Sequence, residues 1–144
     1  MAIKLKLEGF DDLLKEIEKA GGSINTATRK CMVQSADIME SELKSKMSSA
    51  DVDKDLISAM PPAEIESEGN RITARVGYKK GAFNPDDPSD GFKVVFLNYG
   101  TPHRSQHGKV AARGFIQKAK KAARKKIKAE QEKTLTEILK GLSK

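Results

Sequence analysis

Apolar and polar residues alternate at the start of the chain and then change to a helical spacing. Residues 3–8 alternate with a period of two, which predicts a half-buried strand ended by Gly9. Residues 10–22, FDDLLKEIEKAGG, predict a short helix, since acidic residues favour its first turn and the glycine pair ends it. A longer helix is predicted from Ser23, a good cap residue, to about Met47. Its buried face is predicted to consist of apolar residues at steps of three and four: Met32, Ala36, Met39, Leu43 and Met47.

The middle of the chain predicts a β-hairpin. Residues 48–62 are polar and broken by two prolines, so we expect a loop with one turn of helix or strand at 56–57. Residues 63–67 and 71–78 predict two strands joined by a Glu-Gly-Asn turn, because apolar and polar side chains alternate in the second strand. One face of that strand carries Ile72, Ala74, Val76 and Tyr78, and the other carries Arg71, Thr73 and Arg75.

The last part of the chain predicts two loops and a long helix. Residues 79–91 are rich in Gly, Pro, Asn and Asp, so a mobile surface loop is predicted. The stretch 92–100, FKVVFLNYG, is compatible with strand and helix, and its β-branched valines slightly favour a strand. A second mobile loop, small and basic, is predicted over 102–111. An amphipathic helix follows from about Ala112 to near Leu142, with lysines and arginines on its solvated face.

These elements predict an α+β fold with N-terminal helices, a small antiparallel sheet and a long C-terminal helix. A chain of 144 residues fits a single domain spanning 1–144. The apolar runs are only a few residues long, whereas a span of the bilayer needs about 20. The basic start is not followed by an apolar segment, so no signal peptide is expected. We therefore expect a protein made in a cytoplasm, without membrane contact.

Charge is distributed unevenly along the chain. Residues 104–144 carry 13 Lys and Arg against 3 Glu, a balance of +10, whereas residues 1–103 have a balance of −3. A basic tail behind a mildly acidic body fits contact with nucleic acid, and it equally fits docking onto an acidic protein surface. Charge alone does not separate these two classes of partner.

Few residues indicate a metal or a cofactor. Cys31 is the single cysteine and lies within a helical pattern, where a lone thiol is usually a small core residue. His103 and His107 are four residues apart, but Pro102 and Gly108 argue against a helix there, and no third ligand is close in sequence. We expect neither a metal site nor a cofactor.

Candidate hydrolytic residues are similarly weak. Asp86 and Asp87 are adjacent, and residues 51–55 have a DxDxD rhythm that lacks the glycine turn and distant Glu of a calcium loop. Both groups are explained by solubilising acids in loops. The phosphate-binding, zinc-protease and redox motifs are absent from the sequence. An enzyme is not expected, and a small hydrolase would require Asp86 or Asp87 for its activity.

The segment from residue 96 onward resembles a known family. Phe96-Leu97-Asn98-Tyr99-Gly100-Thr101, a loop, and then Ala111-Ala112-Arg113-Gly114-Phe115-Ile116 before a long helix are similar to the small tail-component family of tailed phages and prophages. Members of that family show an aromatic-Gly-Thr step and then an Ala-Arg-Pro-Phe-like step that opens the last helix. The family's earlier Leu-x-x-Ser-Ile-like patch is matched loosely by residues 56–60.

The chain departs from the family pattern at two positions. Asn98 stands where the family usually has Glu, which removes a charge that could hold a basic loop. Gly114 stands where the family has Pro, which removes the stiff start that proline gives to a helix.

The resemblance implies a structural protein of virion morphogenesis. Such proteins act at the head–tail junction or tail end as connector, tail-completion or tail-terminator components. Other neck or tail proteins are then the expected partners, a ring of identical subunits is the expected assembly, and the virion is the expected location. A ring subunit needs two unlike faces for head-to-tail contact, which an acidic-leaning body and a basic tail can offer.

Specific roles follow for the residues of this segment. Tyr99, Gly100 and Thr101 are predicted to form a structural turn, with the Tyr99 ring packed inward and Gly100 allowing a tight bend. The basic loop is either a partner contact or only a solvated connector. The residues predicted to make assembly contacts are Arg104, His107, Lys109, Arg113 and Phe115.

A nucleic-acid role is the alternative function. The C-terminal helix is rich in Lys and Arg and could neutralise phosphates without reading sequence. Aromatic residues do not interleave with these charges, so stacking platforms for single strands are missing. The alternative predicts that replacing Lys120, Lys121, Arg124, Lys125 and Lys126 together abolishes the function.

Overall fold

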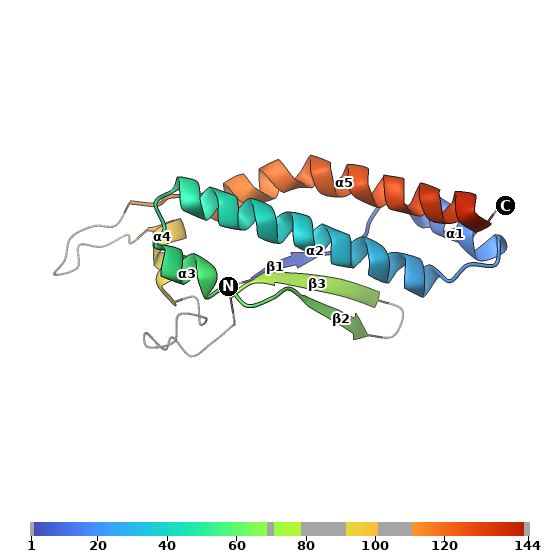
Figure 1. The fold of residues 1–144 in the computed structure, drawn as a ribbon, viewed down its shortest axis with the longest axis horizontal. Helices are drawn as coiled ribbons and strands as arrows, with labels where there is room; N and C mark the ends of the chain where they lie inside the picture. The colour runs from blue at the N-terminus through green and yellow to red at the C-terminus, as the bar shows by residue number, and fades with distance from the viewer. Residues whose placement is uncertain (1, 69–70, 79–91, 101–110, 143–144) are drawn as a thin grey trace.

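The computed structural model describes residues 2–68, 71–78, 92–100 and 111–142, and these form an α+β fold, as predicted (Figure 1). In chain order the elements are β1 (Ala2–Leu5), α1 (Asp11–Lys19), α2 (Ile24–Ser49), α3 (Lys54–Ser58), β2 (Glu64–Glu68), β3 (Arg71–Gly77), α4 (Phe92–Tyr99) and α5 (Phe115–Leu142). No helix in the described ranges combines the length and the apolar character needed to cross a membrane.

The three strands form an antiparallel sheet in the order β1-β3-β2. The predicted hairpin is confirmed, with Glu66 opposite Thr73, while the two residues of its turn, Gly69 and Asn70, lie outside the described residues. β1 pairs with the other side of β3, where Lys4 lies opposite Arg75. β1 and β2 are therefore the two edges of the sheet. The β3 residues on the face predicted to be apolar are all buried: Ile72, Ala74, Val76 and Tyr78.

The core lies between this sheet and the two long helices. α2 packs against the sheet, and α5 runs antiparallel alongside α2 (Figure 1). The Ser23 side chain accepts a hydrogen bond from the Thr26 amide at 3.2 Å, so the predicted cap of α2 is confirmed. The predicted stripe is buried throughout and belongs to the core: Met32, Ala36, Met39, Leu43 and Met47.

A small polar layer crosses the contact between α2 and α5. The Gln131 side-chain amide donates to the Ser35 hydroxyl at 2.9 Å, and that hydroxyl donates to the Cys31 carbonyl at 2.7 Å. Buried polar groups that satisfy one another hold two helices in one relative register. Cys31 is fully buried, as predicted, and burial raises the pKa of its thiol to about 11. The thiol therefore remains protonated at neutral pH.

Residues 92–99 form the helix α4, so the slight preference for a strand was wrong. Val94 and Asn98, one helical turn apart, are buried, whereas Lys93, Phe96 and Tyr99 are exposed. Tertiary contacts of the buried side outweigh the strand propensity of the valines, as is common for short apolar runs.

Other boundaries are close to those predicted. The turn at 56–57 is helical and belongs to α3. The final helix begins at Phe115 and ends at Leu142. The two loops predicted to be mobile, 79–91 and 102–111, lie outside the described residues except for Ala111.

Candidate functional site

The two halves of the segment 96–116 meet in one joint at the end of α4. The backbone amide of Arg113 donates to the Leu97 carbonyl at 3.1 Å, and the amide of Gly114 donates to the Asn98 carbonyl at 3.1 Å. The last carbonyls of a helix lack partners within that helix, so these two bonds satisfy the C-terminus of α4. Gly100 has a φ of +74°, the left-handed conformation that ends many helices and that glycine adopts without strain.

Asn98 connects the joint to the first turn of α5. Its side-chain oxygen accepts a hydrogen bond from the amide of Ile116 at 2.9 Å, and its side chain is buried. Gly114 occupies the cap position of α5, because its carbonyl accepts from the Lys118 amide at 3.2 Å. Glycine has no side chain with which to cap a helix, so Asn98 supplies the missing acceptor from another helix.

The backbone of Gly114 also shapes the entry into α5. Its φ is +61°, which proline cannot adopt because its ring fixes φ near −65°. A proline at this position would therefore require a different entry into α5. The Asn98 cap and the Gly114 backbone form one local solution for starting this helix.

Arg113 anchors the joint to the C-terminus of α2. Its guanidinium donates to the carbonyls of Ala50 at 3.0 Å and Asp51 at 3.3 Å. These carbonyls lie at the negative end of the α2 dipole, where a cation is favourable. α2 ends in a Schellman motif, in which the Val52 amide donates to the Met47 carbonyl at 3.0 Å and Asp51 has a φ of +60°.

The structure corrects two of the predicted roles in this segment. Phe115 was predicted to make an assembly contact, but its side chain is completely buried in the core of its own subunit and cannot touch another protein. Tyr99 is 59% exposed, so its ring does not pack inward. Phe115 begins α5, whose first turn packs into the core, whereas α4 turns Val94 and Asn98 toward the core and Tyr99 away from it.

The remaining predicted residues divide into two groups. Gly100 makes the tight bend that was predicted, and Arg113 is half-buried and hydrogen-bonded within its own subunit. Thr101 and three of the residues predicted to make assembly contacts lie outside the described residues: Arg104, His107 and Lys109. Sequence reasoning missed the role of Asn98, although its departure from the family pattern marked that position.

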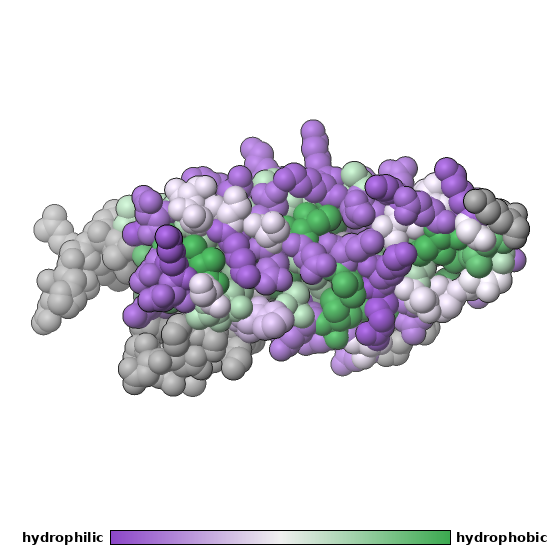
Figure 2. All heavy atoms as spheres, viewed as in Figure 1, coloured by the Kyte–Doolittle hydropathy of each residue, from purple (hydrophilic) through white to green (hydrophobic). Residues whose placement is uncertain are grey.

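Exposed aromatic side chains lie next to this joint. Phe96 and Tyr99 are one turn apart on α4 and are 40% and 59% exposed. The surface elsewhere is more polar, and Figure 2 shows only a few separate hydrophobic patches on the face in view. The solvent side of α4 therefore presents an aromatic surface that the sequence pattern did not predict.

A second feature is a basic groove between β1 and α5. It has a volume of about 680 Å³, and Ile3, Leu5, Met39, Ile127 and Gln131 belong to its lining. Around them lie one carboxylate, Glu8, and five cationic side chains, which we call the groove cations: Lys4, Lys6, Lys120, Arg124 and Lys128. The three on α5 follow one another at steps of four residues, which places them in one row.

The groove refines the prediction that the charges of α5 form a solvated face. The groove cations are exposed, but three of them line a concave surface opposite a strand. Lys126 lies elsewhere on the helix and forms an ion pair with Glu42 of α2. The hydrogen bond from Lys126 lowers the pKa of the Glu42 carboxyl below its usual value of 4.5.

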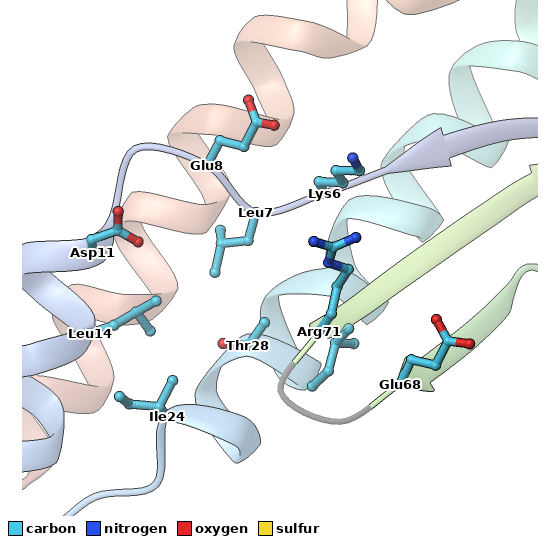
Figure 3. Close-up of a pocket in the computed structure, with 10 residues that line it drawn as sticks. Lys6, Leu7, Glu8, Asp11, Leu14, Ile24, Thr28, Glu68 and Arg71 are labelled. Atoms are coloured by element: carbon cyan, nitrogen blue, oxygen red, sulfur yellow. The ribbon is translucent and has the colours of Figure 1, made fainter.

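A third feature is a hollow where α1, α2 and the sheet converge (Figure 3). It measures about 820 Å³, with Leu7, Leu14 and Ile24 pointing into it and Arg71 rising from β3. Side chains of both charges surround it, among them Lys6 and Glu68. These charges do not converge on one point, so the hollow lacks the arrangement that a small ligand needs.

The metal-binding side chains of the described residues do not gather into a site. No cluster of three or more His, Cys, Asp or Glu residues that could hold a metal ion occurs among them. Asp51 serves the Schellman motif, whereas Asp86, Asp87 and His103 lie outside the described residues. Comparison with protein-family models, with curated proteins and with solved structures finds no match.

Proposed function

We propose that this protein is a structural subunit of a tailed phage or prophage that acts at the head–tail junction or the tail end. It acts through protein–protein assembly rather than catalysis, and its partners are other neck or tail proteins and further copies of itself. It is made in the host cytoplasm and becomes part of the virion. Its specific role is that of a connector, a tail-completion component or a tail-terminator component.

The observation that carries this proposal is the joint at the end of α4. The resemblance to the tail-component family rests on two short motifs separated by a loop, and in the structure both motifs belong to one hydrogen-bonded unit. Arg113 and Gly114 bind the carbonyls of Leu97 and Asn98, and Asn98 caps α5. Two sequence steps that build one joint are more informative together than two unrelated matches would be.

The surfaces beside this joint fit an assembly role. α4 presents exposed aromatic rings at Phe96 and Tyr99, and aromatic residues are enriched in protein–protein interfaces. Arg113 ties α4 and α5 to the end of α2, so the aromatic surface stands on three connected helices. A surface held in this way loses little conformational freedom when a partner binds.

The direct test is removal of the gene from the phage or prophage that encodes it. Electron microscopy should then show filled heads and tails that are not joined, or tails of abnormal length. Re-supply of the intact protein should restore normal particles. Normal numbers of joined, infectious particles without the protein would contradict the proposal.

Binding of nucleic acid is the second candidate, and the groove cations are the observation that favours it. Five cationic side chains against one carboxylate form a surface that can neutralise phosphates. A matched pair of triple variants tests this candidate. One removes α5 charges inside the groove (Lys120→Gln, Arg124→Gln, Lys128→Gln), and the other removes exposed α5 charges that do not line it (Lys118→Gln, Lys121→Gln, Lys125→Gln).

The two candidates predict different results for these variants. If the protein binds duplex DNA, fluorescence anisotropy should show a complex that weakens steeply with salt, and both triple variants should bind less well. If the protein is an assembly subunit, DNA binding is weak in every variant and only the groove variant changes self-association. Tight DNA binding by the intact protein would make the second candidate the leading one.

A further inference from the structure

The two edges of the sheet differ in the sign of their charge. On β2 the exposed residues Glu64, Glu66 and Glu68 alternate along the strand, so they share one face. On β1 the corresponding exposed residue is Lys4, and Lys6 and then Glu8 follow it beyond the end of the strand. One edge strand is therefore acidic and the other is basic.

The strand register aligns these charges across the sheet. Lys4 lies opposite Arg75, and Arg75 lies opposite Glu64, so the three side chains form one cross-strand row. Within the subunit Arg75 pairs with Glu66 at 3.5 Å. Among the described residues, neither Lys4 nor Glu64 has an ion-pair partner, so each end of the row presents an uncompensated charge.

The outer side of β1 is also concave. The groove described above runs between β1 and α5, and its cations on α5 face the same space as Lys4 and Lys6. Its volume of about 680 Å³ leaves room for an extended segment of chain. β2 is a strand of 5 residues and lies at the opposite edge of the sheet (Figure 1).

We propose that the groove beside β1 receives the acidic edge strand β2 of a second copy of this chain, so that copies join head to tail. Glu64 of one subunit then lies beside Lys4 of the next, and Glu66 lies beside Lys6, on the face of the sheet that carries Arg75. The inserted strand also pairs its backbone with the open edge of β1. This interface rests on the proposed assembly function for its biological purpose, and it names the partner as the chain itself.

Strand directions support a repeating contact. β1 and β2 are both antiparallel to β3, so they run in the same direction. A second copy that keeps the orientation of the first therefore adds its β2 parallel to β1, and its own β1 edge remains open for a third copy. A contact between unlike surfaces of this kind closes into a ring or continues as a filament.

The same charges oppose the alternative contacts between two copies. A two-fold dimer through β1 would place lysines against lysines, and one through β2 would place glutamates against glutamates. Charged residues on edge strands normally prevent aggregation. Here the exposed charges of β2 are all negative and those of β1 and the groove are positive except for Glu8, so like edges repel while unlike edges attract.

Charge reversal tests the proposal with one variant for each edge. The acidic-edge variant carries Glu64→Lys and Glu68→Lys and keeps Glu66, which pairs with Arg75. The basic-edge variant carries Lys4→Glu and Lys6→Glu. A matched control carries Glu16→Lys and Glu18→Lys on the exposed side of α1, at positions that line neither the groove nor the hollow. Circular dichroism and thermal unfolding should show that all three variants fold.

Sedimentation should then distinguish the variants. The intact protein and the control should associate as concentration rises, and each edge variant alone should remain at monomer mass. In an equimolar mixture, the reversed β2 of the acidic-edge variant meets the reversed β1 of the basic-edge variant, and the two native edges also meet. Opposite charges then face each other in both contacts, so association should return only on mixing. Failure of the intact protein to associate up to its highest soluble concentration would overturn the proposal.

Cross-linking provides a second test that does not depend on charge reversal. Two variants, Lys4→Cys and Glu64→Cys, are treated with a short bismaleimide, separately and mixed. Cys31 is fully buried and its thiol stays protonated, so it should not react. The mixture should yield a covalent dimer, and each variant alone should yield little. A dimer formed equally by Lys4→Cys alone would overturn head-to-tail pairing.

The tests also show whether the groove is occupied by another molecule, and whether the interface and the proposed phage role stand or fail independently. If only the basic-edge reversal changes binding, and the partner is DNA or another acidic protein, then a second copy is not the occupant. If the edges cross-link while particles lacking the protein remain normal, the interface stands and the phage role fails. If particles require the protein but copies never cross-link, the phage role stands and this interface fails.

Discussion

The joint at the end of α4 and the groove beside β1 use basic side chains in opposite ways. Arg113, in the joint, donates to two backbone carbonyls at the end of α2 and contributes to the stability of its own subunit. Lys120, Arg124 and Lys128, in the groove, form no ion pair or hydrogen bond with the described residues and face a concave surface. The sequence alone assigned Arg113 to a partner and the α5 charges to solvent.

This difference shows that the number of charges in a segment says little about their roles. A cation near free carbonyls at a helix C-terminus is used within the fold. Several cations in one groove produce a positive electrostatic potential that the one carboxylate in the lining, Glu8, does not neutralise, and this potential attracts an acidic partner. The following predictions separate residues that hold the joint from residues that remain for contact.

The largest effect is expected from Phe115→Ala in the joint. Phe115 is completely buried in the core, and removal of a buried phenylalanine ring costs about 3–5 kcal/mol. Urea unfolding should show this loss in the free energy of unfolding. Tyr99→Ala, at a 59% exposed position on α4, is the control and should cost far less. Equal losses would mean that the ring of Tyr99 is part of the core.

Asn98→Ala should have the next largest effect. It removes the acceptor of the Ile116 amide and leaves that donor buried without a partner, which costs about 1–3 kcal/mol. Asn25→Ala is the matched control, because Asn25 lies exposed on α2. Hydrogen exchange should also show faster exchange at the first turn of α5 in the Asn98 variant. An unchanged rate there would contradict the capping role.

A pair of arginine variants compares the two regions directly. Arg113→Ala should lower stability by about 1 kcal/mol, because two carbonyls at the end of α2 lose a charged donor. Arg124→Ala in the groove should leave thermal stability almost unchanged and should weaken self-association instead. If Arg124→Ala destabilises the fold and Arg113→Ala does not, the roles assigned to the two regions are reversed.

The smallest effect is expected at the pair Glu42–Lys126 between α2 and α5. Because Lys126 lowers the pKa of Glu42, the pair stabilises the fold above the usual pKa of 4.5 and loses this contribution as pH falls below it. Glu42→Gln should therefore cost less than about 1 kcal/mol at pH 7. The difference from the intact protein should disappear in acid. A difference that grows as pH falls would contradict this sign.

Local patterns predicted most of the fold. The stripe and the Ser23 cap of α2 depend on residues close in sequence, so spacing and residue type were sufficient to find them. The alternation in β3 identified the hairpin and its buried face for the same reason.

The joint could not be predicted in this way, because its contacts are distant in the chain. Asn98 caps a helix that begins beyond the 101–110 segment, and Arg113 binds carbonyls at the end of α2, more than 60 residues earlier in the chain. The helical state of α4 depends on these contacts and not on its own propensity, so the valines indicated a strand. Likewise, the orientation of α4 leaves Tyr99 exposed, and the packing of the first turn of α5 into the core buries Phe115.

The groove was hidden from sequence for a different reason. Lys4 lies in β1 and Lys6 just after it, and Lys120, Arg124 and Lys128 repeat in α5, but more than 100 residues separate the two sets. Each pattern alone predicted an ordinary solvated face. Only the packing of α5 against α2 brings the two sets to one surface.

The central claim, assembly through unlike surfaces rather than binding of nucleic acid, is tested most directly by light scattering. The mass of the intact protein would be measured over a range of protein and salt concentrations, with and without short duplex DNA. The account predicts that the mass rises above that of the monomer with protein concentration, falls again with salt, and does not depend on DNA. A protein that stays monomeric alone and gains mass only with DNA, in a complex lost as salt rises, would contradict it.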